Sequence, residues 1–225
     1  MREEVLPDPE AAARRGAELI ADAAGRAIAG RGSFSLAVSG GHAPWRMFEL
    51  LGEHELDWER IELFQVDERI APEGDDDRNL THLRASLPEA ALASVRPMPV
   101  NDPDPELAAG HYAEGLPASL DLVHLGLGPD GHTASLVPGD PVLDVRDQLV
   151  AMTGEYQGRR RLTLTYAALE AAGTVLWLVT GDDKREALGK LRAGDESIPA
   201  GRLHARDAVL LASSESLGLT SNSWM

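Results

Sequence analysis

Short apolar runs recur along the chain, and longer stretches with helical spacing of their apolar residues separate them. Continuous apolar runs of this length are typical of strands that are buried on both faces of a sheet. The pattern predicts strands at residues 33–38, 60–66, 121–128, 173–181 and 207–213. Because strands alternate with helices, we expect a mostly parallel sheet with helices on both faces.

The stretches between the strands carry helix signals at their ends. Asp8 is a suitable N-cap, and Pro9 suits the first turn of a helix that Gly30 would end. Further helices are predicted from Pro44 onward, at residues 79–87 and at residues 183–191. The chain is therefore expected to begin with a helix, followed by a strand, a glycine loop and a second helix.

These elements favour a single α/β domain over residues 1–225, doubly wound and Rossmann-like. A chain of this length could also form two small domains. The proline-rich segment 96–106 could mark a boundary, but we interpret it as a surface connection. We expect the C-terminal segment 213–225 to be frayed.

Charge and composition narrow the class of protein. The formal net charge is −16, and no basic stripe offsets it, which argues against binding to nucleic acid or to an anionic membrane. An anionic substrate would have to be captured by a local group of donors.

The absence of cysteine excludes disulfides, thiolate metal sites and a cysteine nucleophile. No apolar run approaches membrane-spanning length, and the N-terminus lacks a signal-peptide core, so we expect a cytoplasmic protein.

Glycine and ionisable residues gather where four of the predicted strands end. In open α/β sheets, the loops beyond the carboxyl ends of the strands meet and hold ligands. The residues at these ends are Ser39, Gly40 and Gly41, then Asp67 and Arg69, then Asp130 and His132, and finally Lys184. The sequence therefore predicts a binding site at this edge of the sheet.

Several of these residues allow two interpretations. Residues 39–41 precede a helix and could bind an anion through backbone N–H groups, or could form a plain tight turn. Lys184 could contact the same anion or remain a surface lysine. Arg69 and Arg161 could clamp a phosphate or carboxylate, or could form surface ion pairs. Asp67 could face the cleft or cap the following loop.

The third of these loops resembles a dinucleotide-binding turn, because its glycines fit the pattern G-x-G-x-x-G at Gly126, Gly128 and Gly131. That motif requires a long helix after the last glycine and an acidic residue about twenty positions further on. Here Pro138 stops any helix, the later acidic residue is missing, and Asp130 would place a negative charge beside the pyrophosphate. The loop instead predicts acid–base chemistry by His132 with Asp130 as orienting carboxylate, although a structural histidine is the alternative.

Two other features are interpreted as structural. His124 lies inside an apolar strand and is expected to be a packed core histidine. Residues 74–79 contain three adjacent aspartates, which lack the alternate-position spacing of a calcium loop, so we expect a solvated turn and no metal.

Five segments of the chain, taken in order, resemble the 6-phosphogluconolactonases, relatives of the glucosamine-6-phosphate deaminases and isomerases. The segments are AVSGGHAPWRMFELL, FQVDERIAPEGDDDRNLTHLRASL, DLVHLGLGPDGHTASLVPG, RLTLTYAALEAAGTVLWLVTGDDKREAL and IPAGRLH. They cover most of the chain, and together they are far more specific than any one glycine loop.

The resemblance implies a role for each candidate residue. His132 would be the general base with Asp130 beside it, while residues 39–41 and Lys184 would bind phosphate. The sugar-phosphate cleft would be lined by Arg69, Asn79 and Arg161. The implied reaction is hydrolysis of 6-phosphogluconolactone to 6-phosphogluconate in the oxidative pentose phosphate pathway, without a metal or organic cofactor. We expect a small-molecule sugar phosphate as partner, and a monomer or small homo-oligomer.

The chain departs from the family pattern at two places. His42 stands where the resembling loops usually carry a small hydroxyl residue. Related deaminases follow the DGH triplet with a further acidic residue, whereas this chain has none before Asp140, which favours a lactonase. Asp67 matches an acid–base aspartate of the deaminase branch and could instead hold substrate hydroxyls here. A deaminase or isomerase, and a non-catalytic sugar-phosphate sensor, remain alternative hypotheses.

Overall fold

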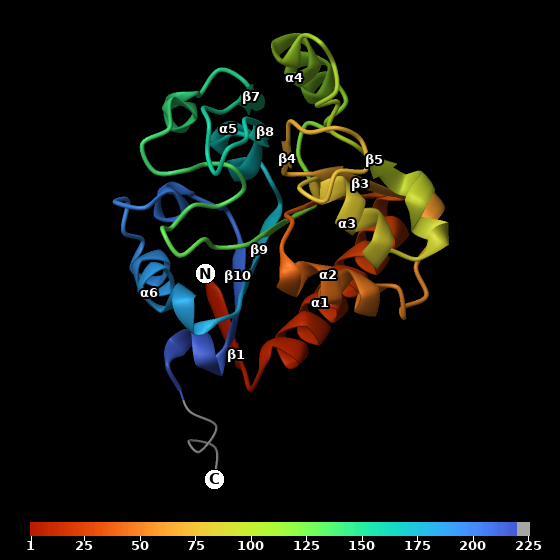
Figure 1. The fold of residues 1–225 in the computed structure, drawn as a ribbon. Helices are drawn as coiled ribbons and strands as arrows, with labels where there is room; N and C mark the ends of the chain where they lie inside the picture. The colour runs from red at the N-terminus through yellow and green to blue at the C-terminus, as the bar shows by residue number, and fades with distance from the viewer. Residues whose placement is uncertain (220–225) are drawn as a thin grey trace.

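Seven parallel strands form the main sheet of the computed structural model, which describes residues 1–219 (Figure 1). In spatial order the strands are β1 (Arg2–Leu6), β10 (Ala208–Ser213), β9 (Thr174–Val179), β6 (Leu122–Leu125), β2 (Phe34–Val38), β3 (Ile61–Gln65) and β5 (Val95–Arg96). Every neighbouring pair in this sheet is parallel. The predicted fold class, a mostly parallel sheet in a single α/β domain, is confirmed.

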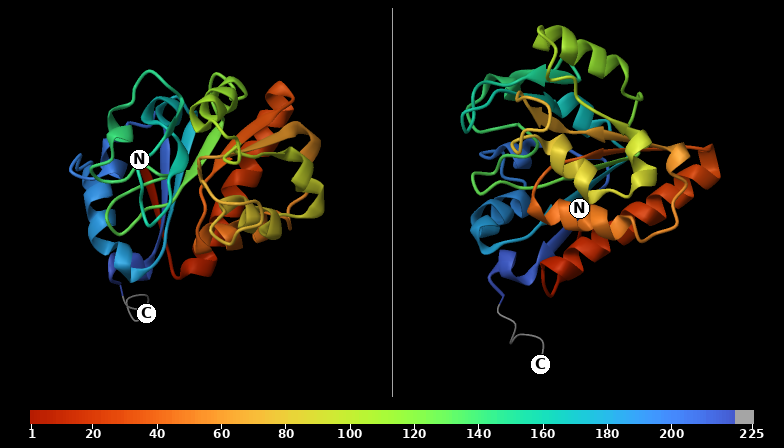
Figure 2. Two further views of the ribbon diagram at one scale, coloured as in Figure 1. Left: turned by 45° about the horizontal axis from the view of Figure 1, so that its top comes forward. Right: turned by 45° about the vertical axis from the view of Figure 1, so that its right-hand side comes forward.

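Helices cover both faces of the sheet, and the two groups lie on opposite sides of it (Figure 2). One face packs against α1 (Pro9–Arg31), α2 (His42–Leu51) and α3 (Asn79–Ser86). The other packs against α4 (Pro105–Glu114), α5 (Tyr166–Glu170) and α6 (Arg185–Ala193). The described residues also include short 3₁₀ helices at Trp58–Arg60, Glu89–Ser94, Pro141–Asp144, Asp182–Lys184, Pro199–Arg202 and Ser214–Leu217.

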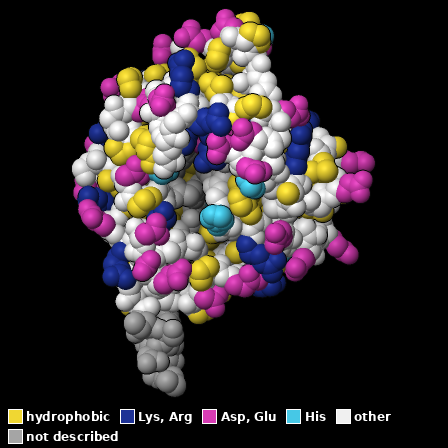
Figure 3. All heavy atoms as spheres, viewed as in Figure 1, with side chains coloured by type: hydrophobic (Ala, Val, Ile, Leu, Met, Phe, Trp, Pro, Cys, Tyr) yellow, Lys and Arg dark blue, Asp and Glu magenta, His cyan; other side chains and the backbone are white. Residues whose placement is uncertain are grey.

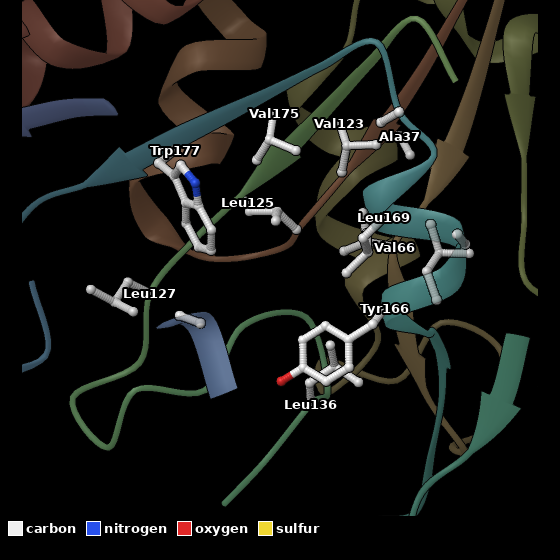
Figure 4. Packing of buried hydrophobic residues seen from close by; sticks show 14 of the residues in the cluster. Ala37, Val66, Val123, Leu125, Leu127, Leu136, Tyr166, Leu169, Val175 and Trp177 are labelled. Atoms are coloured by element: carbon white, nitrogen blue, oxygen red, sulfur yellow. The ribbon is translucent and has the colours of Figure 1, made fainter. Parts of the chain in front are cut away.

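The strands are apolar on both faces because each face contributes to a separate core. In β9, Val175 and Trp177 enter the cluster shown in Figure 4, whereas Leu176 and Leu178 enter the cluster on the opposite face. This alternation follows from the two-residue period of a strand. It explains why the sequence shows continuous apolar runs rather than alternating polar positions.

Both ends of the first helix, α1, have capping residues. The Asp8 carboxylate accepts a hydrogen bond from the Ala11 N–H at 2.8 Å, and Pro9 occupies the first turn. The helix passes Gly30 and ends at Gly32, whose φ of +85° is the left-handed conformation typical of a helix C-terminus.

The structure corrects the expected start of the chain. A strand, β1, precedes α1 and pairs in parallel with β10 at the edge of the sheet. Its residues Arg2, Glu3 and Glu4 are charged, so the segment lacks the apolar pattern of a central strand. Charged side chains of this kind suit an edge strand, where they oppose pairing with other chains.

A second, antiparallel sheet of three strands was also absent from the prediction. It consists of β4 (Asp67–Arg69), β8 (Arg161–Leu164) and β7 (Val150–Met152), in that order. Strands of three or four residues are too short to show a period in the sequence. This sheet matters for function because β4 and β8 carry three of the candidate site residues.

Three connecting segments also differ from expectation. Segment 96–106 is not only a surface connection, since Met98 and Val100 are buried and Asp104 caps α4 through its side chain. Within 213–225, the part up to Leu217 is ordered as a strand end and a 3₁₀ helix, and residues 220–225 lie outside the described residues. The turn at 74–79 is exposed at Asp76 and Asp77, half-buried at Asp75, and ends in two buried residues, Arg78 and Asn79.

A buried carboxylate joins β4 to α3. Glu68 is fully buried and forms an ion pair with Arg78, whose Nε lies 3.2 Å away. It also accepts hydrogen bonds from the backbone N–H groups of Arg69, Asn79 and Leu80, each at 2.8 Å, and from the Gln65 side chain at 2.9 Å. The bonds from Asn79 and Leu80 satisfy the first two N–H groups of α3, whose N-cap residue makes no side-chain capping bond.

His124 is a core histidine, as expected. It is fully buried, its ring lies edge-on to Phe48, and burial lowers its pKa to about 3. Its Nδ1 accepts a hydrogen bond from the Ser39 N–H at 3.4 Å, which places an uncharged ring beneath the loop at the end of β2.

We predict that Glu68→Ala lowers the free energy of unfolding by about 3–5 kcal/mol, because it leaves the Arg78 guanidinium buried without its partner. Urea denaturation followed by circular dichroism would measure the change. The control is Glu186→Ala, which breaks the exposed Glu186–Lys190 pair on α6 and should leave the free energy of unfolding nearly unchanged. A Glu68→Ala protein as stable as the control would contradict this assignment.

His124 should make stability fall on mild acidification. The unfolded chain binds a proton at His124 below a pH of about 6.5, whereas the folded chain does not until far lower pH, so stability falls by roughly 1.4 kcal/mol per pH unit. His124→Leu should remove this one-proton slope between pH 6 and 4.5 in urea denaturation at a series of pH values. His204→Leu, at an exposed position, should keep the slope. Equal slopes in both variants would refute the prediction.

Candidate active site

The loops at the carboxyl ends of β2, β3, β6 and β9 surround one cleft of about 790 Å³. Figure 3 shows the hollow, with histidine and cationic side chains near its rim. Nine of the ten candidate residues line it: Ser39, Gly40, Gly41, Asp67, Arg69, Asn79, His132, Arg161 and Lys184. The tenth, Asp130, does not line the cleft and instead contacts His132.

His132 and Asp130 form a hydrogen-bonded pair at the end of β6. The His132 Nδ1 lies 2.6 Å from the Asp130 Oδ1, and the same oxygen accepts a bond from the His132 backbone N–H at 3.1 Å. Because an ionised carboxylate only accepts hydrogen bonds, Nδ1 carries the proton and the lone pair of the ring is on Nε2. A partly exposed imidazole held this way can accept a proton from a molecule in the cleft.

Two glycines of this loop stand where a side chain would not fit. Gly128 lies against the pair, and a Cβ at this position would overlap both the His132 ring and the Asp130 carboxylate. Gly131 has a φ of +84° and packs against Ile198, so it needs both the left-handed conformation and the missing side chain. The loop is not followed by a long helix: the next element is the 3₁₀ helix at Pro141–Asp144, which agrees with the rejection of a dinucleotide site.

Asp130 remains ionised in this setting. Burial raises the pKa of its carboxyl, but attraction to His132 and the hydrogen bonds from His132 and Tyr156 together bring that pKa below its ordinary value. The carboxylate is therefore available to stabilise an imidazolium when His132 takes up a proton.

Two arginines face the cleft from the small sheet. Arg69 on β4 and Arg161 on β8 are directly opposed residues of the antiparallel ladder. The Arg161 side chain is buried, and this burial is the main cause that lowers its pKa; the positive charge of Arg69 lowers it further. The Nε atoms of both side chains are buried and have no hydrogen-bond partner among the described residues. Like charges opposed across a ladder destabilise it, so an anion between them would be bound favourably.

Asp67 is held between two neighbours at the start of β4. Its Oδ2 accepts a hydrogen bond from the Ser135 hydroxyl at 2.6 Å, and its Oδ1 lies 3.4 Å from the Asn79 Nδ2. The Asn79 amide also donates to the Asp67 carbonyl at 3.0 Å. Both carboxylate oxygens thus have protein partners, while the side chain still lines the cleft.

The glycine loop after β2 leads directly into α2. Within the described chain, no side chain caps this helix, and Gly41 stands at its N-cap with a φ of +132°. The first N–H groups of α2 and its positive dipole end face the same cleft, which suits an anion. The Ser39 hydroxyl is buried and has no hydrogen-bond partner among residues 1–219. His42 is exposed, begins the helix and also lines the cleft.

Lys184 approaches the cleft from the end of β9. It ends the 3₁₀ helix at Asp182–Lys184, and its Nζ lies 2.8 Å from the Asp183 carboxylate. Both side chains line the cleft. The Lys184 side chain is only 21% exposed, so it is not a fully solvated surface lysine.

The structure adds residues that the sequence analysis missed. Trp45 and His82 stack with ring centroids 5.7 Å apart and line the cleft from α2 and α3. Ser135 is fully buried and lies between Asp67 and Arg161, while Tyr156 contacts Asp130. The signal for Ser135 was its place three residues after His132; nothing in the sequence pointed to Tyr156.

The described residues contain no group of three or more histidine, cysteine or acidic side chains that could hold a metal ion. In the same part of the chain, no helix is long and apolar enough to cross a bilayer. The cleft combines the His132 imidazole, whose Nε2 can accept a proton, with three cationic side chains and an uncapped helix start. This set of groups suits a small anionic substrate and a reaction that begins with proton abstraction, for example from water.

Known proteins resemble the chain over most of its length. The family model described as glucosamine-6-phosphate isomerases/6-phosphogluconolactonase matches residues 7–212. A 6-phosphogluconolactonase of Nostoc sp. is 35% identical over 203 residues, which cover 84% of this chain and 84% of that protein. A 6-phosphogluconolactonase of Synechocystis sp. is 38% identical over 184 residues, 75% of each chain.

Solved structures agree with the fold. The 6-phosphogluconolactonase from Thermotoga maritima superimposes with a TM-score of 0.84 at 26% identity, covering 94% of this chain and 98% of that one. A monomeric glucosamine-6-phosphate deaminase has a TM-score of 0.85 at 19% identity, a likeness that concerns the fold alone. Because the family model spans residues 7–212, the chain belongs to the glucosamine-6-phosphate isomerase/6-phosphogluconolactonase family.

Proposed function

We propose that the protein is a 6-phosphogluconolactonase, which hydrolyses 6-phosphogluconolactone to 6-phosphogluconate in the oxidative pentose phosphate pathway. The observation that carries the proposal is the His132–Asp130 pair, which leaves a proton-accepting Nε2 on an imidazole that lines a cationic cleft. The similarity to proteins named 6-phosphogluconolactonase over three quarters or more of the chain supports it.

The reaction follows from the roles of these groups. His132 takes a proton from a water molecule as that water attacks the lactone carbonyl, and the resulting imidazolium returns a proton to the departing ring oxygen. Asp130 stabilises the imidazolium. The negative charge that develops on the carbonyl oxygen needs a donor, and the arginine pair on β4 and β8 supplies cationic N–H groups within the same cleft.

The phosphate is assigned to the loop after β2. Residues 39–41, the free N–H groups at the start of α2 and the Lys184 ammonium form the anion site, while Arg69, Asn79 and Arg161 line the remainder of the cleft. Anchoring the phosphate places the ester carbon beside His132, so that binding energy remote from the reaction contributes to its rate. Asp67 has both oxygens engaged by the protein and is assigned to substrate hydroxyls rather than to proton transfer.

The protein works on a small sugar phosphate, without a metal or organic cofactor and without nucleic acid. It is cytoplasmic and acts as a monomer or small homo-oligomer.

The alternative deaminase or isomerase activity would release ammonia from glucosamine 6-phosphate. A non-catalytic sensor would bind the sugar phosphate without turning over the lactone, so assays for both products distinguish the three hypotheses.

His132→Ala should lower kcat/KM for 6-phosphogluconolactone by about 10²–10⁴-fold, because it removes the general base. Loss of lactone, corrected for spontaneous hydrolysis, gives the rate, and circular dichroism gives the fold. His204→Ala, far more exposed and outside the cleft, is the matched control and should keep full activity. Undiminished turnover by a folded His132→Ala protein would refute the assigned role.

Lys184→Met should weaken catalysis only where the substrate carries a phosphate. Losing a charged hydrogen-bond donor should reduce kcat/KM for 6-phosphogluconolactone by roughly 10–100-fold, while turnover of unphosphorylated gluconolactone stays the same. Lys190→Met, on the exposed face of α6, serves as the control and should change neither. Equal losses for both lactones would mean that Lys184 does not bind the phosphate.

A further inference from the structure

The connection between β7 and β8 forms a tight hairpin beside the active site. Tyr156 and Arg159 pair across it, with the Tyr156 N–H 3.0 Å from the Arg159 oxygen. Gln157 and Gly158 between them have φ values of +52° and +76°. Two successive positive φ values are typical of a type I′ turn, whose twist matches that of the flanking strands. The turn therefore holds Tyr156 in a defined place.

Tyr156 contacts the carboxylate that orients the general base. Its hydroxyl donates a hydrogen bond to the Asp130 Oδ2 at 3.2 Å, while the Asp130 Oδ1 faces the His132 Nδ1 at 2.6 Å. Each carboxylate oxygen thus has its own partner, which fixes the rotation of the carboxylate. The Tyr156 ring also meets the His132 ring edge-on, with centroids 5.5 Å apart.

Tyr156 remains a donor at neutral pH. Burial raises the pKa of its hydroxyl above the ordinary value, and the charge and hydrogen bond of Asp130 raise it further, against the opposing charge of Arg161. The groups that act on the Asp130 carboxylate are His132 and Tyr156, so the hydroxyl of Tyr156 supplies one of its few hydrogen bonds.

The same tyrosine supports the cationic wall of the cleft. The Arg161 guanidinium lies over the Tyr156 ring at 5.0 Å from its centroid, and one of its N–H groups points to the Tyr156 carbonyl oxygen at 3.5 Å. A guanidinium above an aromatic face is attracted to it. The side chain of Tyr156 itself does not line the cleft, so it acts on the substrate only through other residues.

We propose that Tyr156 is a positioning residue for the reaction: through Asp130 it keeps the His132 Nε2 directed into the cleft, and through its ring it holds Arg161. The effect on turnover rests on the proposed lactonase function. The hydrogen bond to Asp130 does not, and it is tested separately.

The test compares Tyr156→Phe with Tyr166→Phe. Both changes delete one hydroxyl, but Tyr166 is buried in the core and donates to the Pro199 oxygen at 2.7 Å, outside the cleft. Tyr156→Phe should lower kcat for 6-phosphogluconolactone about tenfold and leave KM nearly unchanged, because the ring beneath Arg161 remains. Tyr166→Phe should lower Tm and leave kcat unchanged. Tyr156→Leu, which also removes the ring, should raise KM as well.

A second readout does not depend on the reaction. In ¹³C-aspartate-labelled protein, with the Asp130 signal assigned from Asp130→Asn, the carboxyl carbon should titrate at higher pH in Tyr156→Phe than in the wild type. An unchanged titration, or a kcat within about twofold of the wild type, would overturn the proposal. So would a rise in KM with kcat unchanged, since it would indicate a role in binding alone. If the wild type does not hydrolyse the lactone, the proposed function fails, while the Asp130 titration still decides whether Tyr156 acts on the carboxylate.

Discussion

The cleft depends on one buried carboxylate, that of Glu68. It receives hydrogen bonds from the backbone of β4 and from the first N–H groups of α3, and it pairs with the buried Arg78. The residues next to these bonds, Asp67, Arg69 and Asn79, are all part of the cleft wall. A buried ion pair is costly in desolvation, so its contribution here is to fix the relative position of a short strand and a helix. The hydrogen bonds of Glu68 thereby hold α3 and β4 together at the wall of the cleft.

Much of the fold could be predicted from the sequence, for physical reasons that differ between elements. Strands buried on both faces, such as β9, are continuous apolar runs. The start of a capped helix such as α1 is marked by single residues, here Asp8 and Pro9. In contrast, β1 is charged and gains its order from β10, which lies some two hundred residues away in sequence. The small sheet consists of strands with no readable period. Such elements exist through tertiary pairing, which local patterns do not report.

The candidate site divides in the same way. His132 and Asp130 were recognisable because they are two residues apart in a glycine loop, a separation short enough for their side chains to form a hydrogen bond. Tyr156 lies 26 residues from Asp130, in a hairpin between two unpredicted strands. The net charge of −16 gave no sign of the arginine pair, because Arg69 and Arg161 meet only when β4 and β8 pair. Proximity that depends on strand pairing is therefore the part of a site that a single sequence conceals.

The place of β1 in the sheet has a consequence for how the chain is made. Among the strands of residues 1–219 it pairs with β10 alone, and three strands synthesised later, β6, β9 and β10, lie between β1 and β2. Synthesis runs from β1 toward β10, so β1 must wait until β10 has emerged from the ribosome before the two can pair. Until then β1, the strand that precedes α1, has no neighbouring strand to pair with. The pairing of β1 with β10 is thus the last step that completes this edge of the sheet.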